Sequence, residues 1–174
     1  DELKELGIEV EPNIKLANAT NPNIETIRNS MIPTQLCQLN VNKGYAPEFG
    51  IFEIGRAVNG LSADGMCDEH KMLGLTLLDK ALPEEDVFLT VRDVVVTLFR
   101  TIKHVTPSFV TKAAPLDFMH PINSFDVLVD DVVYGTISVL HPAVKAKIDR
   151  KASIAFAEID MGLFAELAPR AITY

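Results

Sequence analysis

The chain has 174 residues, enough for one well-buried core, and its 16 basic and 24 acidic side chains give a formal charge of −8. This acidic balance argues against a nucleic-acid-binding surface, DNA included, because phosphate backbones are bound by clusters of Lys and Arg. The chain is 48% hydrophobic, but no apolar run approaches the ~18 residues of a membrane span. We therefore expect a single domain over residues 1–174, without a membrane segment, whose surplus apolar surface contacts another protein.

The two cysteines, Cys37 and Cys67, are too few and too far apart for a disulfide framework or a four-ligand zinc site. This usage is typical of a reducing compartment, so we expect a cytoplasmic location. The sequence begins at Asp1 rather than Met and ends at Tyr174 without a clear helix stop. We interpret it as a fragment of a longer polypeptide.

The first 20 residues are predicted to form a lead-in segment. It starts with a short helix over residues 1–6 that is closed by Gly7, followed by two short extended runs, 8–10 and 14–17. A cluster of turn-forming residues at 18–23 then interrupts regular structure.

A helix is predicted to start at Pro33, because proline is tolerated in a first helical turn, and to end near Gly44. Its apolar stripe consists of Ile32, Leu36 and Leu39. Residues 51–58 alternate in polarity and are rich in β-branched and aromatic types, which predicts a strand directly after this helix. A polar loop over 61–69 precedes the nearly continuous apolar run 70–78, typical of a strand in the middle of a sheet and covered on both faces.

A long helix is predicted from the acidic residues 84–86, which favour a helix N-terminus, to Lys103. Its apolar face is expected to consist of Phe88, Val91, Val95, Leu98, Phe99 and Ile102. The rest of the chain is predicted as a short strand over 106–111, a hairpin of 125–129 and 132–139, a helix over 142–148, a strand over 153–159, and a helix over 161–167 that Asp160 caps.

Hairpins rather than repeated strand–helix–strand crossovers join these strands. The sequence therefore predicts an α+β fold, in which a mainly antiparallel sheet, mixed in part, is flanked by helices on one side.

The residues alone point to no catalytic, cofactor-binding or metal site. None of the four histidines lies near a Ser or Cys in a nucleophile motif. The Cys67 and His70 pair has no second ligand pair downstream, as a structural metal would require. The glycines form no phosphate-binding loop. The acidic pairs 84–85 and 130–131 are expected to be solvated, at a helix start and a hairpin tip respectively.

Several short motifs occur in a fixed order along the chain. They are Asn21-Pro22, Arg28-Asn29-Ser30-Met31-Ile32-Pro33, Phe52-Glu53-Ile54-Gly55-Arg56, and Tyr134-Gly135 leading to Leu140-His141-Pro142. Each is weak alone, but their order makes chance a poor explanation. Over residues 15–167 the chain resembles the catalytic-like module of the phenylalanyl-tRNA synthetase beta subunit. The resemblance implies a fold like the catalytic domain of class II aminoacyl-tRNA synthetases.

The resemblance also implies that this module has lost catalysis. Class II enzymes hold ATP with two arginines, and the matching positions here are Asn59 and Gly162. Asn lacks the fixed charge and the forked donor set that phosphate recognition uses, and Gly has no side chain. We therefore expect no cofactor in this domain, while the parent enzyme uses ATP and Mg²⁺ to attach phenylalanine to its tRNA.

The partner that the resemblance implies is the alpha subunit, in an α2β2 assembly in which other beta modules make most tRNA contacts. The leading interpretation is thus a non-catalytic structural and assembly module that supports alpha. The alternative is a small-molecule-binding or regulatory domain that reuses the same fold. Under the first interpretation, we expect an amide-rich stripe beside the apolar one on the first long helix to contact alpha. It comprises Met31, Gln35, Gln38 and Asn42.

Overall fold

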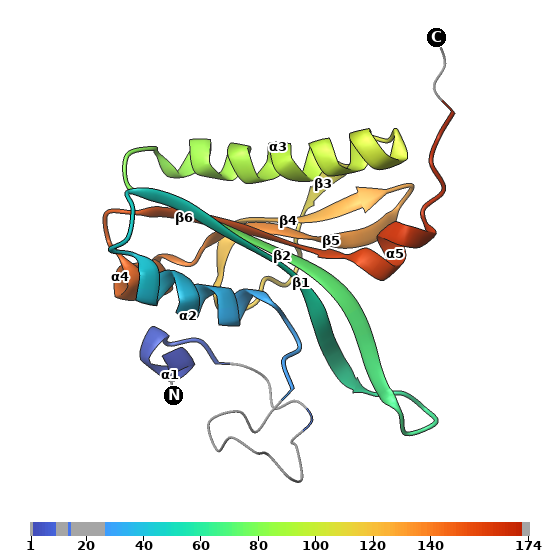
Figure 1. Cartoon of the computed structure of the whole chain (residues 1–174), viewed down its shortest axis with the longest axis horizontal. Coiled ribbons are helices and arrows are strands. Elements are labelled where there is room, and N and C mark those ends of the chain that lie inside the picture. The colour runs from blue at the N-terminus through green and yellow to red at the C-terminus, as the bar shows by residue number, and fades with distance from the viewer. Residues whose placement is uncertain (1, 10–13, 15–26, 172–174) are drawn as a thin grey trace.

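A computed structural model describes residues 2–9, 14 and 27–171 (Figure 1). Most of the predicted extended runs and the turn cluster at 18–23 lie outside the described residues. The short helix at the start is confirmed as α1 (Glu2–Leu6) and is closed by Gly7 at a φ of 71°, a left-handed conformation that glycine adopts without strain.

The remaining elements agree with the predicted order. They are α2 (Ile32–Asn42), β1 (Glu48–Leu61), β2 (Cys67–Asp79), α3 (Glu84–Lys103), β3 (Ser108–Thr111), β4 (Met119–Val129), β5 (Val132–Leu140), α4 (Pro142–Ile148), β6 (Ser153–Asp160) and α5 (Met161–Glu166). No helix in the part of the chain that the structure describes is long and apolar enough to cross a membrane.

The six strands form one sheet in the order β1-β2-β6-β5-β4-β3, and each neighbouring pair is antiparallel. The predicted α+β class with a mainly antiparallel sheet is confirmed, although its expected mixed character is not seen. At the tip of the predicted hairpin between β4 and β5, Asp130 and Asp131 have φ values of 50° and 64°. Two successive positive φ angles match the twist of a tight hairpin turn.

Helices cover both faces of the sheet, not one face as predicted (Figure 1). The reason is visible in β6, which is apolar at successive positions: Ile154 and Phe156 pack on the side of α1, α2 and α4, whereas Ala155 and Ala157 pack on the side of α3. Successive strand residues point to opposite faces, so a continuous apolar run requires two covers. We call these two clusters the α2-side core and the α3-side core.

The predicted position of β2 in the sheet interior is confirmed. Leu78 belongs to the α2-side core, and Leu73, Leu75 and Leu77 pack against the α3-side core. Both β1 and β2 are longer than predicted, because residues from the expected polar loop pair across the hairpin: Val58 lies opposite Glu69, and Leu61 opposite Cys67. Only residues 62–66 remain as the connection.

The buried stripe of α3 differs in part from the prediction. Val91, Val95 and Phe99 are buried as expected, and Phe88 and Leu98 are partly buried. Ile102, however, is 51% exposed. The stripe follows a strict four-residue spacing from Val87 to Lys103, which places Ile102 beside it. The buried Lys103 ammonium donates to the Ala165 carbonyl oxygen at 3.1 Å, so its polar end is satisfied.

Phe99 and Ile102, near the end of α3, provide a matched test of this packing. Phe99 is fully buried, so Phe99→Ala should lower the free energy of unfolding by about 3–5 kcal/mol. Ile102→Ala should change it by no more than about 0.5 kcal/mol, because exposed positions tolerate truncation. Urea unfolding of both variants measures this, and equal losses would mean that the helix is rotated from the position described.

Candidate functional site

The segment that leads into α2 is attached to the edge of the sheet through Arg28. The Arg28 carbonyl oxygen accepts a hydrogen bond from the Val58 backbone N–H at 2.9 Å. Its guanidinium forms a two-nitrogen contact with the Glu53 carboxylate, at 2.7 and 3.3 Å, and its Nε donates to the Arg56 carbonyl oxygen at 3.1 Å. The side chain and backbone of Arg28 therefore both bind β1 of the same chain.

The N-terminus of α2 is held by Glu158 of β6. The Met31 backbone N–H donates to Glu158 Oε1 at 2.6 Å, and the Ser30 hydroxyl donates to Oε2 at 2.9 Å. The Ile32 backbone N–H in turn donates to Ser30 Oγ at 3.2 Å. Backbone N–H groups at a helix start lack partners within the helix, and the helix dipole favours a negative charge there. Glu158 thus acts as an N-terminal cap supplied by the sheet.

Burial raises the pKa of the Glu158 carboxyl group, while its hydrogen bonds to Met31 and Ser30 and the nearby charge of Arg28 act in the opposite direction. A raised pKa means that the folded state favours the protonated form. The contribution of this shift to stability is therefore complete below the ordinary carboxyl pKa and is lost as the pH rises through the raised value. Ionised Glu158 still supplies both acceptor oxygens.

Two glycines allow α2 to lie close to the sheet. A Cβ atom at Gly74 would lie 2.7 Å from Met31 Cβ, and one at Gly55 would lie 2.8 Å from Met31 Cε. Both distances are shorter than ordinary carbon contacts, which are about 3.5–4.0 Å. At Gly74 the obstacle is Met31 Cβ, which is fixed to the helix backbone, so a larger residue there would push the N-terminus of α2 away from Glu158. At Gly55 the nearest atoms are the ends of the Arg28, Met31 and Glu53 side chains, so a larger residue there would displace these side chains.

The predicted interface stripe is wrong for Met31 and Gln35, which are both 0% exposed. The buried face of α2 is wider than the apolar spacing indicates, because Gln35 is accommodated by a hydrogen bond from its Nε2 to the Gly74 carbonyl oxygen at 3.0 Å. Sequence reasoning missed this contact, although a glycine in the middle of an apolar strand was a signal for close approach. Gln38 and Asn42 are exposed.

The two positions that the sequence resemblance aligns with class II arginines lie on the surface. Asn59 is exposed in β1, at the register shift between Val58 and Leu61. Gly162 is exposed in the first turn of α5. Neither residue offers a cationic side chain. Glu158, which lies on β6 just before α5, is hydrogen-bonded to the start of α2.

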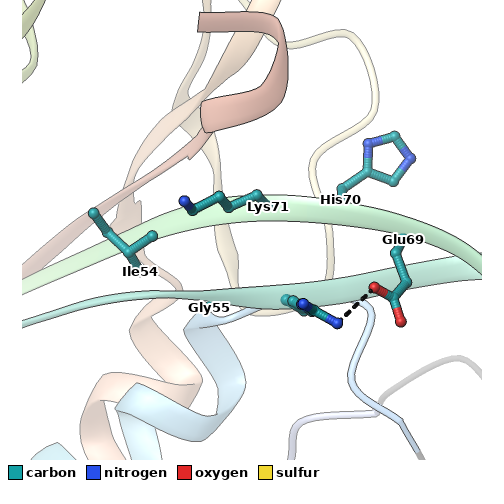
Figure 2. A pocket seen from close by; sticks show the side chains of 6 residues that line it. Ile54, Gly55, Glu69, His70 and Lys71 are labelled. Atoms are coloured by element: carbon teal, nitrogen blue, oxygen red, sulfur yellow. Dashed lines mark hydrogen bonds and ion pairs between the residues drawn. The ribbon is translucent and has the colours of Figure 1, made fainter. Parts of the chain in front are cut away.

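A depression of about 440 Å³ lies along the β1–β2 hairpin (Figure 2). Its lining residues are Ile54, Gly55, Arg56, Glu69, His70 and Lys71. Arg56 and Glu69 pair at 3.2 Å across the two strands. Because both side chains are largely exposed, this ion pair contributes little to stability.

His70 contacts two carboxylates. Its Nδ1 lies 3.0 Å from Asp160 Oδ2, and its Nε2 lies 3.2 Å from Asp68 Oδ2. Hydrogen bonding to Asp160, and secondly to Asp68, raises the pKa of the imidazole. The sequence analysis did not pair His70 with either of these carboxylates. Within the described residues, no group of three His, Cys, Asp or Glu side chains is arranged to hold a metal ion.

Comparison with known proteins gives the family. The model of the phenylalanyl tRNA synthetase beta chain CLM domain matches residues 1–161. The chain belongs to this family. A curated relative of this CLM domain is the phenylalanine–tRNA ligase beta subunit of Leptospira biflexa serovar Patoc, 28% identical over 160 residues, which are 88% of this chain and 20% of the relative.

The beta subunit of Leptospira borgpetersenii serovar Hardjo-bovis is 26% identical to this CLM domain over 170 residues, which are 94% of the chain and 21% of the relative. The chain therefore spans about a fifth of the length of the curated relatives that it matches.

The cap on α2 can be tested in the CLM domain by two substitutions. Glu158→Ala removes the acceptor for the Met31 N–H and the Ser30 hydroxyl, and should cost about 1–3 kcal/mol of unfolding free energy. Glu158→Gln keeps one acceptor oxygen and should cost less. Since burial raises the Glu158 pKa, the wild type should also lose stability relative to Glu158→Gln as the pH rises from 4 to 7. Urea unfolding across this range measures both effects, and equal costs for Ala and Gln at every pH would exclude the cap.

Proposed function

We propose that this domain is a non-catalytic assembly module of a phenylalanine–tRNA ligase beta subunit, which supports the alpha subunit that attaches phenylalanine to its tRNA with ATP. The observation that carries the proposal is the internal use of the motif residues. Arg28 binds Glu53 and the backbone of β1, and Ser30 binds Glu158. Polar groups that are satisfied within the fold serve its architecture and are not available to bind a substrate.

The class II-like fold is part of this proposal. A six-stranded antiparallel sheet with helices on both faces is compatible with such a domain, and the residues at the arginine positions, Asn59 and Gly162, fit a domain without an ATP site. We assign ATP and Mg²⁺ to the parent enzyme and no cofactor to this domain. The same proposal places the ligase in the cytoplasm and most tRNA contacts in other beta modules.

The outer side of α2 is the surface that we assign to the alpha subunit in an α2β2 assembly. Gln38 and Asn42 are exposed there, and two apolar side chains near the end of the helix, Val41 and Tyr45, are 74% and 88% exposed. Aromatic side chains beside hydrogen-bonding amides are typical of protein interfaces. Together they form what we call the α2 outer surface: Gln38, Val41, Asn42 and Tyr45.

The α2 outer surface can be tested in a full beta subunit that carries both Gln38→Glu and Val41→Asp. The domain should keep its stability to within about 0.5 kcal/mol per site, because both positions are exposed. Assembly with alpha should weaken at least tenfold, because unpaired charges would be buried against the partner. Sedimentation velocity measures assembly, and Thr97→Glu, at an exposed position on α3, is the matched control. Undiminished heterotetramer in the double variant would contradict this assignment.

A ligand-binding test distinguishes the assembly module from the alternative, a small-molecule-binding or regulatory domain. The isolated chain should show no heat of binding with ATP and Mg²⁺, and no phenylalanine-dependent pyrophosphate exchange, because Asn59 and Gly162 provide no phosphate-binding charge. The assembled ligase serves as the positive control for both assays. Saturable ATP binding by the isolated chain would favour the alternative, and exchange above background would overturn the assembly proposal.

A further inference from the structure

His70 lies where the β1–β2 hairpin leaves the rest of the sheet. The pairing of β2 with β6 starts at Met72, which lies opposite Asp160, whereas the pairing of β2 with β1 continues outward to Cys67. Figure 1 shows this part of the hairpin projecting beyond the other strands. We call residues 56–71 the hairpin arm. The contact between His70 and Asp160 therefore joins the base of the arm to the end of β6.

The geometry around His70 favours two protons on the ring. Both ring nitrogens face a carboxylate oxygen, Nδ1 toward Asp160 and Nε2 toward Asp68. A carboxylate only accepts hydrogen bonds, and a neutral imidazole has a single N–H. Both contacts can be hydrogen bonds only when the ring is an imidazolium.

Asp160 is shared between His70 and α5. While its Oδ2 faces His70, its Oδ1 accepts a hydrogen bond from the Leu163 backbone N–H at 2.9 Å and so caps α5. The helix is in turn attached to α3, because the Phe164 ring packs edge-on against Phe99 with 4.9 Å between centroids. Through Asp160, the charge on His70 is therefore coupled to the docking of α5.

The other charged groups near His70 have partners elsewhere or lie further along the strands. Arg56 and Glu69 pair with each other across the arm, and Lys71 lines the same depression. On β6, Glu158 binds Ser30 and Met31, and Arg28 of the segment before α2 binds Glu53. The first turn of α5 contributes no charged side chain. Asp68 and Asp160 are thus the carboxylates in direct contact with the ring.

We propose that His70 is a pH-dependent clasp between the hairpin arm and the N-terminus of α5. When it is doubly protonated, it holds Asp68 and Asp160 together. When it loses one proton, it can keep only one of the two hydrogen bonds, and the two carboxylates then face a neutral ring. Because the folded state favours the charged ring, the contribution of the clasp to stability is complete below the ordinary histidine pKa of about 6.5. This contribution is lost as the pH rises above that value.

The first test is a titration of the ring nitrogens by ¹⁵N nuclear magnetic resonance on the 174-residue chain. The reference is the ordinary histidine pKa of about 6.5. His70 should stay doubly protonated above this pH, and Asp68→Asn or Asp160→Asn should each lower the pH at which the ring loses its proton. Asn can still cap α5 in the second variant, so the helix should persist. A wild-type His70 that loses its proton at the ordinary histidine pKa would overturn the proposal.

The second test shows whether the charge on His70 stabilises the attachment of the hairpin arm and of α5. Amide hydrogen exchange is measured from pH 6 to 9 and expressed as protection factors, at Leu163 and at arm residues such as Val58. In the wild type, these factors should fall as His70 loses its proton, by up to about tenfold for each pH unit that separates the folded and unfolded titrations. In His70→Gln, which cannot titrate, they should stay flat. A flat profile in the wild type, or the same fall in His70→Gln, would overturn the clasp.

Discussion

The structure depends on one contact, the carboxylate of Glu158 against the N-terminus of α2. This helix must lie on a face of the sheet that is apolar, yet its first backbone N–H groups require acceptors. Glu158 resolves the conflict from the central strand β6, where it accepts hydrogen bonds from Met31 and Ser30. The charge loses hydration in this position, and the raised pKa reflects that loss. The helix dipole and the hydrogen bonds offset part of the cost.

The other features around α2 are consequences of this contact. Gly55 and Gly74 leave room for Met31, and Arg28 ties the incoming segment to the edge strand through Glu53. Gln35 then reaches the backbone of Gly74 under the helix. Motif residues that sequence comparison associates with a ligase family therefore form a helix-docking unit in this domain. Once α2 is fixed on the sheet, its outer surface is presented in a defined orientation, as the proposed assembly role requires.

Most of the fold could be predicted because its signals are local. The acidic start of α3, the Asp130-Asp131 turn and the cap at Asp160 each depend on residues adjacent in sequence. The second layer of helices was not predicted, although the apolar runs of β2 and β6 each indicate a strand that is covered on both faces. The burial of Gln35 and the partners of His70 were missed for another reason: Gly74 is 39 residues from Gln35, and Asp160 is 90 residues from His70. The local spacing of residues along the chain does not show which distant residues will contact each other.

The central claim, that Glu158 and the start of α2 act as one unit, is tested most directly by a double-mutant cycle. Ser30→Ala, Glu158→Ala and the double variant are compared with the wild type by urea unfolding at pH 7. The account predicts that the double variant loses less stability than the sum of the single losses, by at least about 0.5 kcal/mol, because each single change already breaks the shared hydrogen bond. Additive losses, to within about 0.3 kcal/mol, would show that the two side chains act independently and would contradict the account.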